Sequence, residues 1–216
     1  MLSKVLNGIS AGLMVSIGCT VFLACENKVV GSVLFTVALL VICFRGYSLY
    51  TGKIGFIPFS HTKEDFSVLL LGLLGNAIGM IAFGLLISVA LPTLPNIKEK
   101  AILLCSAKLE QTWAQTVIRG LFCGVLMFIA VYVYKENKSI VAIIFAIPTF
   151  ILCGFEHSVA DIGYFAIANM FSFEIVLFII LVVIGNTIGS MILPYLQIAQ
   201  KSKAVVSKEK QDEKAS

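Results

Sequence analysis

The sequence Gly-Asn-Ala-Ile-Gly at residues 75–79 returns as Gly-Asn-Thr-Ile-Gly at residues 185–189, an offset of 110 residues. The same offset relates Glu-Asn-Lys at residues 26–28 to residues 136–138. Other pairs keep an offset of 110 or 108, namely Phe35 with Phe145, Cys43 with Cys153, Gly46-Tyr47 with Gly154-Phe155, and Ile54-Gly55-Phe56 with Ile162-Gly163-Tyr164. An ordered series of this kind predicts one structural unit used twice.

The composition predicts that both copies lie in a membrane. The 216 residues are 59% hydrophobic and 13% charged, with a mean hydropathy of +0.99, which excludes a soluble enzyme fold. A transmembrane helix needs roughly 20 mainly apolar residues. Six stretches qualify, at about 5–25, 29–50, 66–92, 112–134, 139–171 and 173–196. The first is expected to remain as a helix, because no small-x-small cleavage site closes it before Glu26.

Three of these stretches fall in each copy, and because three is odd the second copy enters the membrane from the opposite side. The sequence therefore predicts an all-α membrane protein of six transmembrane helices, arranged as two inverted three-helix repeats. We expect a single transmembrane domain over 1–196, with repeats at about 3–92 and 112–196. Residues 197–216 are polar and lysine-rich, and we expect a disordered cytoplasmic tail there.

The charged residues predict an orientation and exclude some partners. With both termini inside, the cytoplasmic segments hold nine lysines and the outer loops four, which favours a multi-pass protein of the cell membrane with cytoplasmic termini. The net charge of +4 is scattered over loops and tail, so no nucleic-acid partner is expected. The six cysteines occur singly, without a Cys-x-x-Cys pair, so neither a metal nor another cofactor is expected.

Two polar runs, residues 45–53 and 154–161, interrupt the second and fifth apolar stretches. Backbone freed by a break at membrane depth is tolerated only where protein or a water-lined cavity satisfies it. A charge at the centre of a membrane helix costs roughly 2.5–3.5 kcal/mol on insertion scales. The charged and titratable side chains of these runs are therefore candidates for a functional site: Arg45, Lys53, Glu156, His157 and Asp161.

At these two runs the sequence resembles the formate/nitrite transporter family of small-anion channels. The stretch Gly-Phe-Glu-His-Ser-Val-Ala at residues 154–160 is similar to the signature around that family's central histidine. Leu49-Tyr50-Thr51 is similar to its leucine-aromatic-threonine loop. Lys4 and Lys108 stand where the family carries vestibule lysines, and the likeness extends from about residue 3 to residue 196.

The resemblance implies an aquaporin-like protomer with helices 2 and 5 broken, assembled as a homopentamer with a pore through each subunit. It assigns one apolar constriction to Phe35 with Leu39 and the other to Phe150 with Leu49. Between the two constrictions, the residues implied to face the permeating anion are His157 and Thr51, with Tyr50 in the same loop.

The function implied by this resemblance is transport of formate or nitrite through the membrane. Hydrosulfide and short carboxylates such as lactate are alternatives of similar charge. His157 has two alternative uses, since it can donate a proton so that a neutral acid passes, or only a hydrogen bond to an anion that stays charged. Burial disfavours the imidazolium, but the residues alone leave both uses open, with or without a proton as co-substrate. Lys4 and Lys108 at the two mouths would concentrate anions.

Three positions depart from the family pattern. Asp161 stands where the family usually has asparagine, Arg45 where a small or neutral residue is common, and Gly124 where an asparagine is expected. Because positions 53 and 161 are equivalent in the repeat, we expect Asp161 to neutralise Arg45 or Lys53 across the pseudo-two-fold axis. Glu156 is expected to brace the loop through backbone N–H groups rather than to touch the substrate.

Two other classes of protein compete with transport. An intramembrane hydrolase would use Ser158 and His157, but adjacent side chains diverge in direction and the sequence has no Gly-x-Ser-x-Gly motif. A membrane assembly protein that transports nothing would have no use for the two polar runs. We therefore expect a transport protein and not an enzyme.

Overall fold

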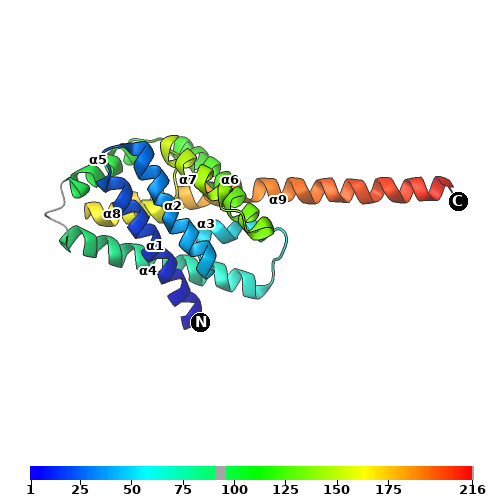
Figure 1. The fold of residues 1–216 in the computed structure, drawn as a ribbon, viewed down its shortest axis with the longest axis horizontal. Helices are drawn as coiled ribbons and strands as arrows, with labels where there is room; N and C mark the ends of the chain where they lie inside the picture. Colours follow the sequence, from blue (N-terminus) through cyan, green and yellow to red (C-terminus); the bar gives the residue numbers. More distant parts are fainter. Residues whose placement is uncertain (91–95, 216) are drawn as a thin grey trace.

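The computed structural model describes residues 1–90 and 96–215, and within these ranges the regular secondary structure is helical (Figure 1). The elements follow one another as α1 (Leu2–Ala24), α2 (Lys28–Arg45), α3 (Tyr50–Lys53), the 3₁₀ turn η1 (Ile54–Phe56), α4 (Lys63–Ala90), α5 (Ile97–Leu109), α6 (Trp113–Asn137), α7 (Val141–Leu152), α8 (Ser158–Ala168) and α9 (Phe173–Ala215).

Five of the described helices, α1, α2, α4, α6 and α9, are long and apolar enough to cross a membrane by length and composition. The shorter apolar helices α7 and α8, of 12 and 11 residues, divide the stretch 139–171 that the sequence predicts as one span. α5 lies where the sequence predicts no span. The end of the predicted span 66–92, and with it the end of the first predicted repeat, lies outside the described residues.

The long helices pack as two pairs, α1 with α4 and α6 with α9. Within each pair, the two helices approach so closely that only glycine fits at the contact. A Cβ atom at Gly75 of α4 would overlap the carbonyl oxygen of Val5, and one at Gly189 of α9 would overlap that of Leu121. α3 and α8 each contact members of both pairs, which places these two short helices in the middle of the protein.

Each of these short helices follows a non-helical connection, called a junction below: residues 46–49 precede α3 and residues 153–157 precede α8. Each junction contains a glycine in the left-handed backbone conformation near its start. α2 ends at Arg45 and Gly46 has φ +68°, while α7 ends at Leu152 and Gly154 also has φ +68°. Residues other than glycine adopt this conformation only at a cost. The chain then runs to α3 and α8, whose first residues, Tyr50 and Ser158, are 108 positions apart.

A buried asparagine binds the backbone at each junction. Asn76 Oδ1 accepts the N–H of Tyr50 at 2.9 Å, and its Nδ2 donates to the carbonyl oxygens of Gly8 and Ser48. Asn186 repeats this pattern with the N–H of Ser158 and the carbonyl oxygens of Gly120 and Glu156. Backbone groups left unpaired by the two helix ends are satisfied in this way.

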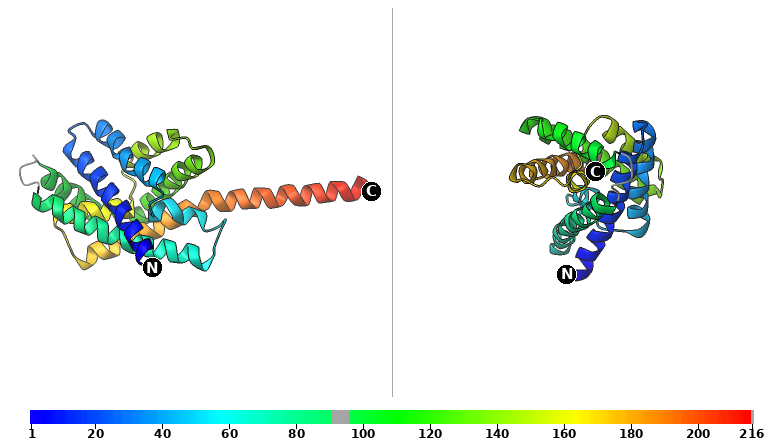
Figure 2. Two further views of the ribbon diagram at one scale, coloured as in Figure 1. Left: turned by 60° about the horizontal axis from the view of Figure 1, so that its bottom comes forward. Right: turned by 90° about the vertical axis from the view of Figure 1, so that its left-hand side faces the viewer.

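α9 continues to Ala215 and extends beyond the other helices (Figure 2). The sequence predicts disorder from residue 197, whereas the structure gives this segment helical backbone. Residues 199–215 contain neither glycine nor proline and are rich in lysine, glutamate, glutamine and alanine, which are good helix formers. A helix already nucleated in an apolar segment gains one hydrogen bond for each residue added, which explains the difference.

Candidate functional site

The two junctions meet at a hydrogen bond between Thr51 and His157. Thr51 Oγ1 lies 2.8 Å from His157 Nε2, and the two residues are 1% and 4% exposed. The N–H of Ala160 donates to His157 Nδ1 at 3.1 Å, so this nitrogen must carry a lone pair and no proton. The ring is then neutral, with its proton on Nε2 and donated to Thr51. Both ring nitrogens are therefore engaged within the protein.

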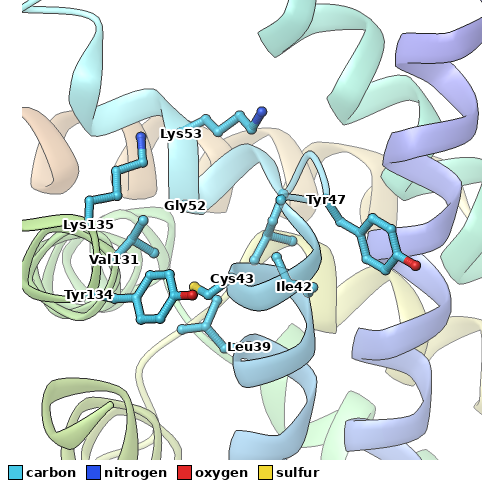
Figure 3. Close-up of a pocket in the computed structure, with 11 residues that line it drawn as sticks. Leu39, Ile42, Cys43, Tyr47, Gly52, Lys53, Val131, Tyr134 and Lys135 are labelled. Atoms are coloured by element: carbon cyan, nitrogen blue, oxygen red, sulfur yellow. The ribbon is translucent and has the colours of Figure 1, made fainter. Parts of the chain in front are cut away.

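Three cavities follow one another near this pair; His157 lines two of them, whereas Thr51 lines none. The first, of about 140 Å³, is lined among others by Leu39, Leu49, Tyr134 and the two lysines Lys53 and Lys135 (Figure 3). The second, of only about 10 Å³, shares Leu39 and Leu49 with the first and is also lined by Phe35, Phe150 and His157. The third, of about 70 Å³, shares Phe35, Phe150 and His157 with the second and is also lined by Lys108 and Asp161.

The apolar residues predicted at the constrictions all line the second cavity. The sequence pairs Phe35 with Leu39, and Phe150 with Leu49. In the structure, Leu39, Ile42 and Leu49 line both the first and the second cavity, whereas Phe35, Phe150 and His157 line both the second and the third. Which of these residues form a constriction together stays a prediction. The Phe150 ring stacks on the His157 ring, with centroids 5.6 Å apart and an interplanar angle of 15°.

A buried ion cluster borders the third cavity. Lys108 Nζ, on α5, contacts Glu156 Oε2 and lies 2.9 Å from Asp161 Oδ1. Gln111 Nε2 donates to the second oxygen of Glu156 at 2.6 Å. The predicted pairing of Asp161 with Arg45 or Lys53 is therefore wrong. Because α5 packs on α8, it brings Lys108 to Asp161 from a segment that lies outside the repeated elements.

Several other predicted residues lie away from these cavities. Lys4 pairs with Glu64 at 2.8 Å and donates to Ser67, so it joins α1 to α4. Arg45 is exposed and lines none of the three cavities, and Lys108 is buried and lines the third cavity. Tyr50 points its hydroxyl to Thr187 Oγ1 at 2.7 Å and likewise lines none of them. Gly124 packs against α9, where a Cβ would overlap the carbonyl oxygen of Asn186.

Other residues around the cavities are not indicated by the sequence. Lys135 and Tyr134 line the first cavity from α6, opposite Cys43 of α2 (Figure 3). Lys135 also places its ammonium 3.6 Å from the centroid of the Phe56 ring. Because Lys135 lies near the end of an apolar stretch, the sequence indicates only that it is one of the cytoplasmic lysines. Gln111 and Tyr164 carry no signal in the sequence that would have distinguished them from other polar and aromatic residues.

The five helices that are long and apolar enough to cross a membrane are those of a multi-pass helical membrane protein. A family model for formate/nitrite transporters matches residues 1–198, and the chain belongs to that family. It is 30% identical over 148 residues to the uncharacterized transporter YwcJ of Bacillus subtilis (strain 168), covering 63% of this chain and 58% of the relative. It is 28% identical over 181 residues to the formate channel FocB of Escherichia coli (strain K12), covering 74% and 64%. Alignment with these two relatives thus spans less than two thirds of their length.

The fold also matches solved structures. A pentameric formate channel with formate bound superposes with a TM-score of 0.72 at 19% identity, covering 95% of this chain and 97% of the other. An FNT family ion channel superposes with a TM-score of 0.76 at 22% identity, covering 91% and 88%. At these identities the matches establish the fold, which is the all-helical fold of this family.

Proposed function

We propose that this protein conducts small monovalent anions across a membrane, with formate or nitrite as substrate. The observation that carries the proposal is the buried His157 ring, which lines two adjoining cavities bordered by apolar side chains and bonds to Thr51. A polar pair buried at such a point offers a permeating anion a hydrogen-bond donor where water is excluded. The names of the relatives, a formate channel among them, support the same class of substrate.

The path proposed for the anion runs through the three cavities in order. Lys53 and Lys135 provide positive charge at the first cavity, and neither makes an ion pair within the described ranges. Leu39 with Leu49, and Phe35 with Phe150, are the two apolar slits. Lysines that line a cavity raise the local concentration of anions. The apolar slits oppose the passage of hydrated ions of either sign, so the preference for anions rests on the lysines and on the site at His157.

His157 acts on the anion indirectly, through its hydrogen bond to Thr51, rather than by giving up a proton from an imidazolium. The N–H of Ala160 occupies Nδ1, and a second ring proton would clash with it. Since Nε2–H donates to Thr51, the hydroxyl proton of Thr51 is free to point to the anion. His157 therefore orients the hydroxyl of Thr51, and the anion stays charged at this point unless it carries its own proton.

The predicted six-helix architecture belongs to the same proposal. α7 and α8 form one broken span and α2 with α3 another, within a single transmembrane domain over residues 1–196. The matched hydrogen bonds of Asn76 and Asn186 support two inverted repeats. The pentameric relative supports a homopentamer with a pore in each subunit. We place the protein in the cell membrane with both termini in the cytoplasm, because lysines are more frequent on that side.

The alternatives are separated by their chemistry. Hydrosulfide and lactate have the charge of formate, so they remain alternative substrates of the same pore. For an intramembrane hydrolase, Ser158 Oγ would have to contact His157, but this buried oxygen has no hydrogen-bond partner among the described residues. Nε2 of His157 is already engaged by Thr51, which further disfavours a Ser158–His157 pair.

Uptake of formate, nitrite, hydrosulfide and lactate into proteoliposomes, followed by stopped-flow light scattering, tests the proposal. We expect flux of formate or nitrite well above that of protein-free vesicles, and a loss of about tenfold or more in His157→Phe, because the ring can no longer orient Thr51. Trp113→Phe, a change at an exposed residue that lines none of the three cavities, is the control. Equal flux in His157→Phe and the control would contradict the proposal.

A further inference from the structure

The ion cluster at the third cavity holds two carboxyl groups against one ammonium group. Lys108 Nζ contacts both Glu156 and Asp161, and the three residues are 8%, 2% and 1% exposed. With every group ionised, the cluster would carry a net charge of −1 in a buried site. An uncompensated buried charge is costly, and such a site lowers the cost by taking up a proton. A net negative charge would also repel the anion that the third cavity is proposed to admit.

The hydrogen bonds distinguish the two carboxyl groups. Both oxygens of Glu156 accept from nitrogen donors, Oε2 from Lys108 and Oε1 from Gln111. Asp161 accepts from Lys108 through Oδ1, whereas its Oδ2 is buried and has no hydrogen-bond partner among the described residues. A proton on Glu156 would weaken two charge-assisted hydrogen bonds, whereas Asp161 Oδ2 accepts no hydrogen bond that a proton could weaken. The free oxygen of Asp161 is therefore the place for the proton.

Among the described residues, no second cation makes an ion pair with the cluster; the Arg119 guanidinium lies near Gly154 but pairs with neither carboxyl group. His157 is the nearest imidazole, but its Nδ1 already accepts from Ala160. The other titratable groups around Asp161 are thiols and a phenol, each of which can only add negative charge when it ionises: Cys19 of α1, Cys105 of α5, Cys123 of α6 and Tyr164 of α8. The charge balance of the site therefore rests on the protonation of a carboxyl group.

We propose that Asp161 is a proton-binding residue that keeps a proton on Oδ2 and offers its O–H to a monovalent anion in the third cavity. Asp161 lines that cavity together with Lys108 and His157. The ligand named here rests on the proposed function, but the bound proton does not. The cavity would then present a neutral donor and a lysine whose charge is balanced by Glu156. The anion meets no net negative charge before it reaches Thr51 and His157.

Infrared difference spectroscopy of the protein in lipid vesicles tests the bound proton without measuring transport. Spectra are recorded while the pH is lowered from about 9 to about 5, a range that covers the titration of perturbed carboxyl groups. We expect a carboxylic-acid C=O absorption at neutral pH that Asp161→Asn abolishes. Glu110→Gln, which removes an exposed carboxyl on the same chain segment as Lys108, should retain it.

Glu156→Gln separates proton binding from a merely structural role. With one carboxyl left for Lys108, Asp161 should ionise, and the proton concentration that half-restores its C=O absorption should rise about tenfold or more. This variant also keeps the test valid if Asp161→Asn does not fold. Spectra without any absorption assigned to Asp161, or an unchanged midpoint in Glu156→Gln, would overturn the proposal.

Formate uptake into the same vesicles tests the donor role. Between about pH 6 and pH 9, wild-type flux should fall about fivefold more than the flux of Asp161→Asn, since only the aspartate can lose its donor. The same pH dependence in both proteins would overturn the donor role. Absence of formate flux in every variant, with the spectra as expected, would contradict the proposed function and leave the bound proton established.

Discussion

Asn76 and Asn186 make equivalent sets of three backbone hydrogen bonds, one set at each junction between a long helix and a short one. Each amide joins the first residue of the short helix, the residue two positions before it, and a glycine on a neighbouring long helix. Both side chains are completely buried. The positions of Thr51 and His157 thus depend on two amides that touch neither residue.

Replacing Asn76 by alanine should destabilise the protein strongly. The change leaves the N–H of Tyr50 and the carbonyl oxygen of Ser48 without their side-chain partner and removes a second donor from the helical carbonyl of Gly8, which costs about 2–5 kcal/mol in total. Asn7→Ala removes a single bond, to the N–H of Ser48, and should cost only about 1 kcal/mol. Thermal unfolding in lipid nanodiscs measures both. Equal losses in the two variants would show that the Asn76 amide is not the main support of the junction.

Thr51→Val should reduce formate flux about tenfold, because it keeps the shape of the side chain and removes the hydroxyl that bonds to His157. Thr51→Ser retains the hydroxyl and should conduct clearly better than the valine variant. Stopped-flow uptake gives both rates. If valine and serine variants conduct equally, the hydroxyl has no part in conduction.

Phe150→Ala should widen the slit that it forms with Phe35 and so relax the selection by size. Removing a buried phenyl ring costs stability of about 3–5 kcal/mol but opens space beside His157. We expect the ratio of lactate to formate flux to rise, with wild type and Phe145→Ala as controls. Phe145 is 68% exposed on the same helix and lines none of the three cavities. An unchanged flux ratio would place the size barrier elsewhere.

Gly189→Ala should prevent the packing of α9 on α6, because the added methyl group would overlap the carbonyl oxygen of Leu121. Overpacking costs about 1–3 kcal/mol when side chains can move, and more against a backbone atom. Gly52→Ala is the control, since its Cβ would meet Val131 at an ordinary 3.4 Å. Expression and thermal unfolding should distinguish them. A Gly189→Ala protein as stable as the control would mean that the two helices can separate without loss.

The sequence predicts the positions of the long helices well, since the length of an apolar stretch is nearly sufficient to define them. It also locates both junctions, because Gly46 and Gly154 begin polar runs at equivalent places in the repeat. Contacts between residues of different helices could not be predicted from the sequence. The partner of Asp161 is on α5. This helix has no counterpart in the repeat, and no apolar stretch in the sequence predicts it. The pairing of the slit residues stays a prediction, because spacing along one helix does not reveal which residue of another helix lies opposite.

The helix contacts at Gly75 and Gly189 bear on how the pore can open and close. At these points the backbones of α1 and α4, and of α6 and α9, touch without side chains between them. Sliding one helix past its partner would drive the neighbouring, larger residues into the opposing backbone, so each pair moves as a rigid unit. In the proposed function, control of conduction then falls to the torsion angles of a few buried side chains, such as Phe35, Phe150 and Leu49. Each of these rotations changes the width of the proposed path without moving a helix.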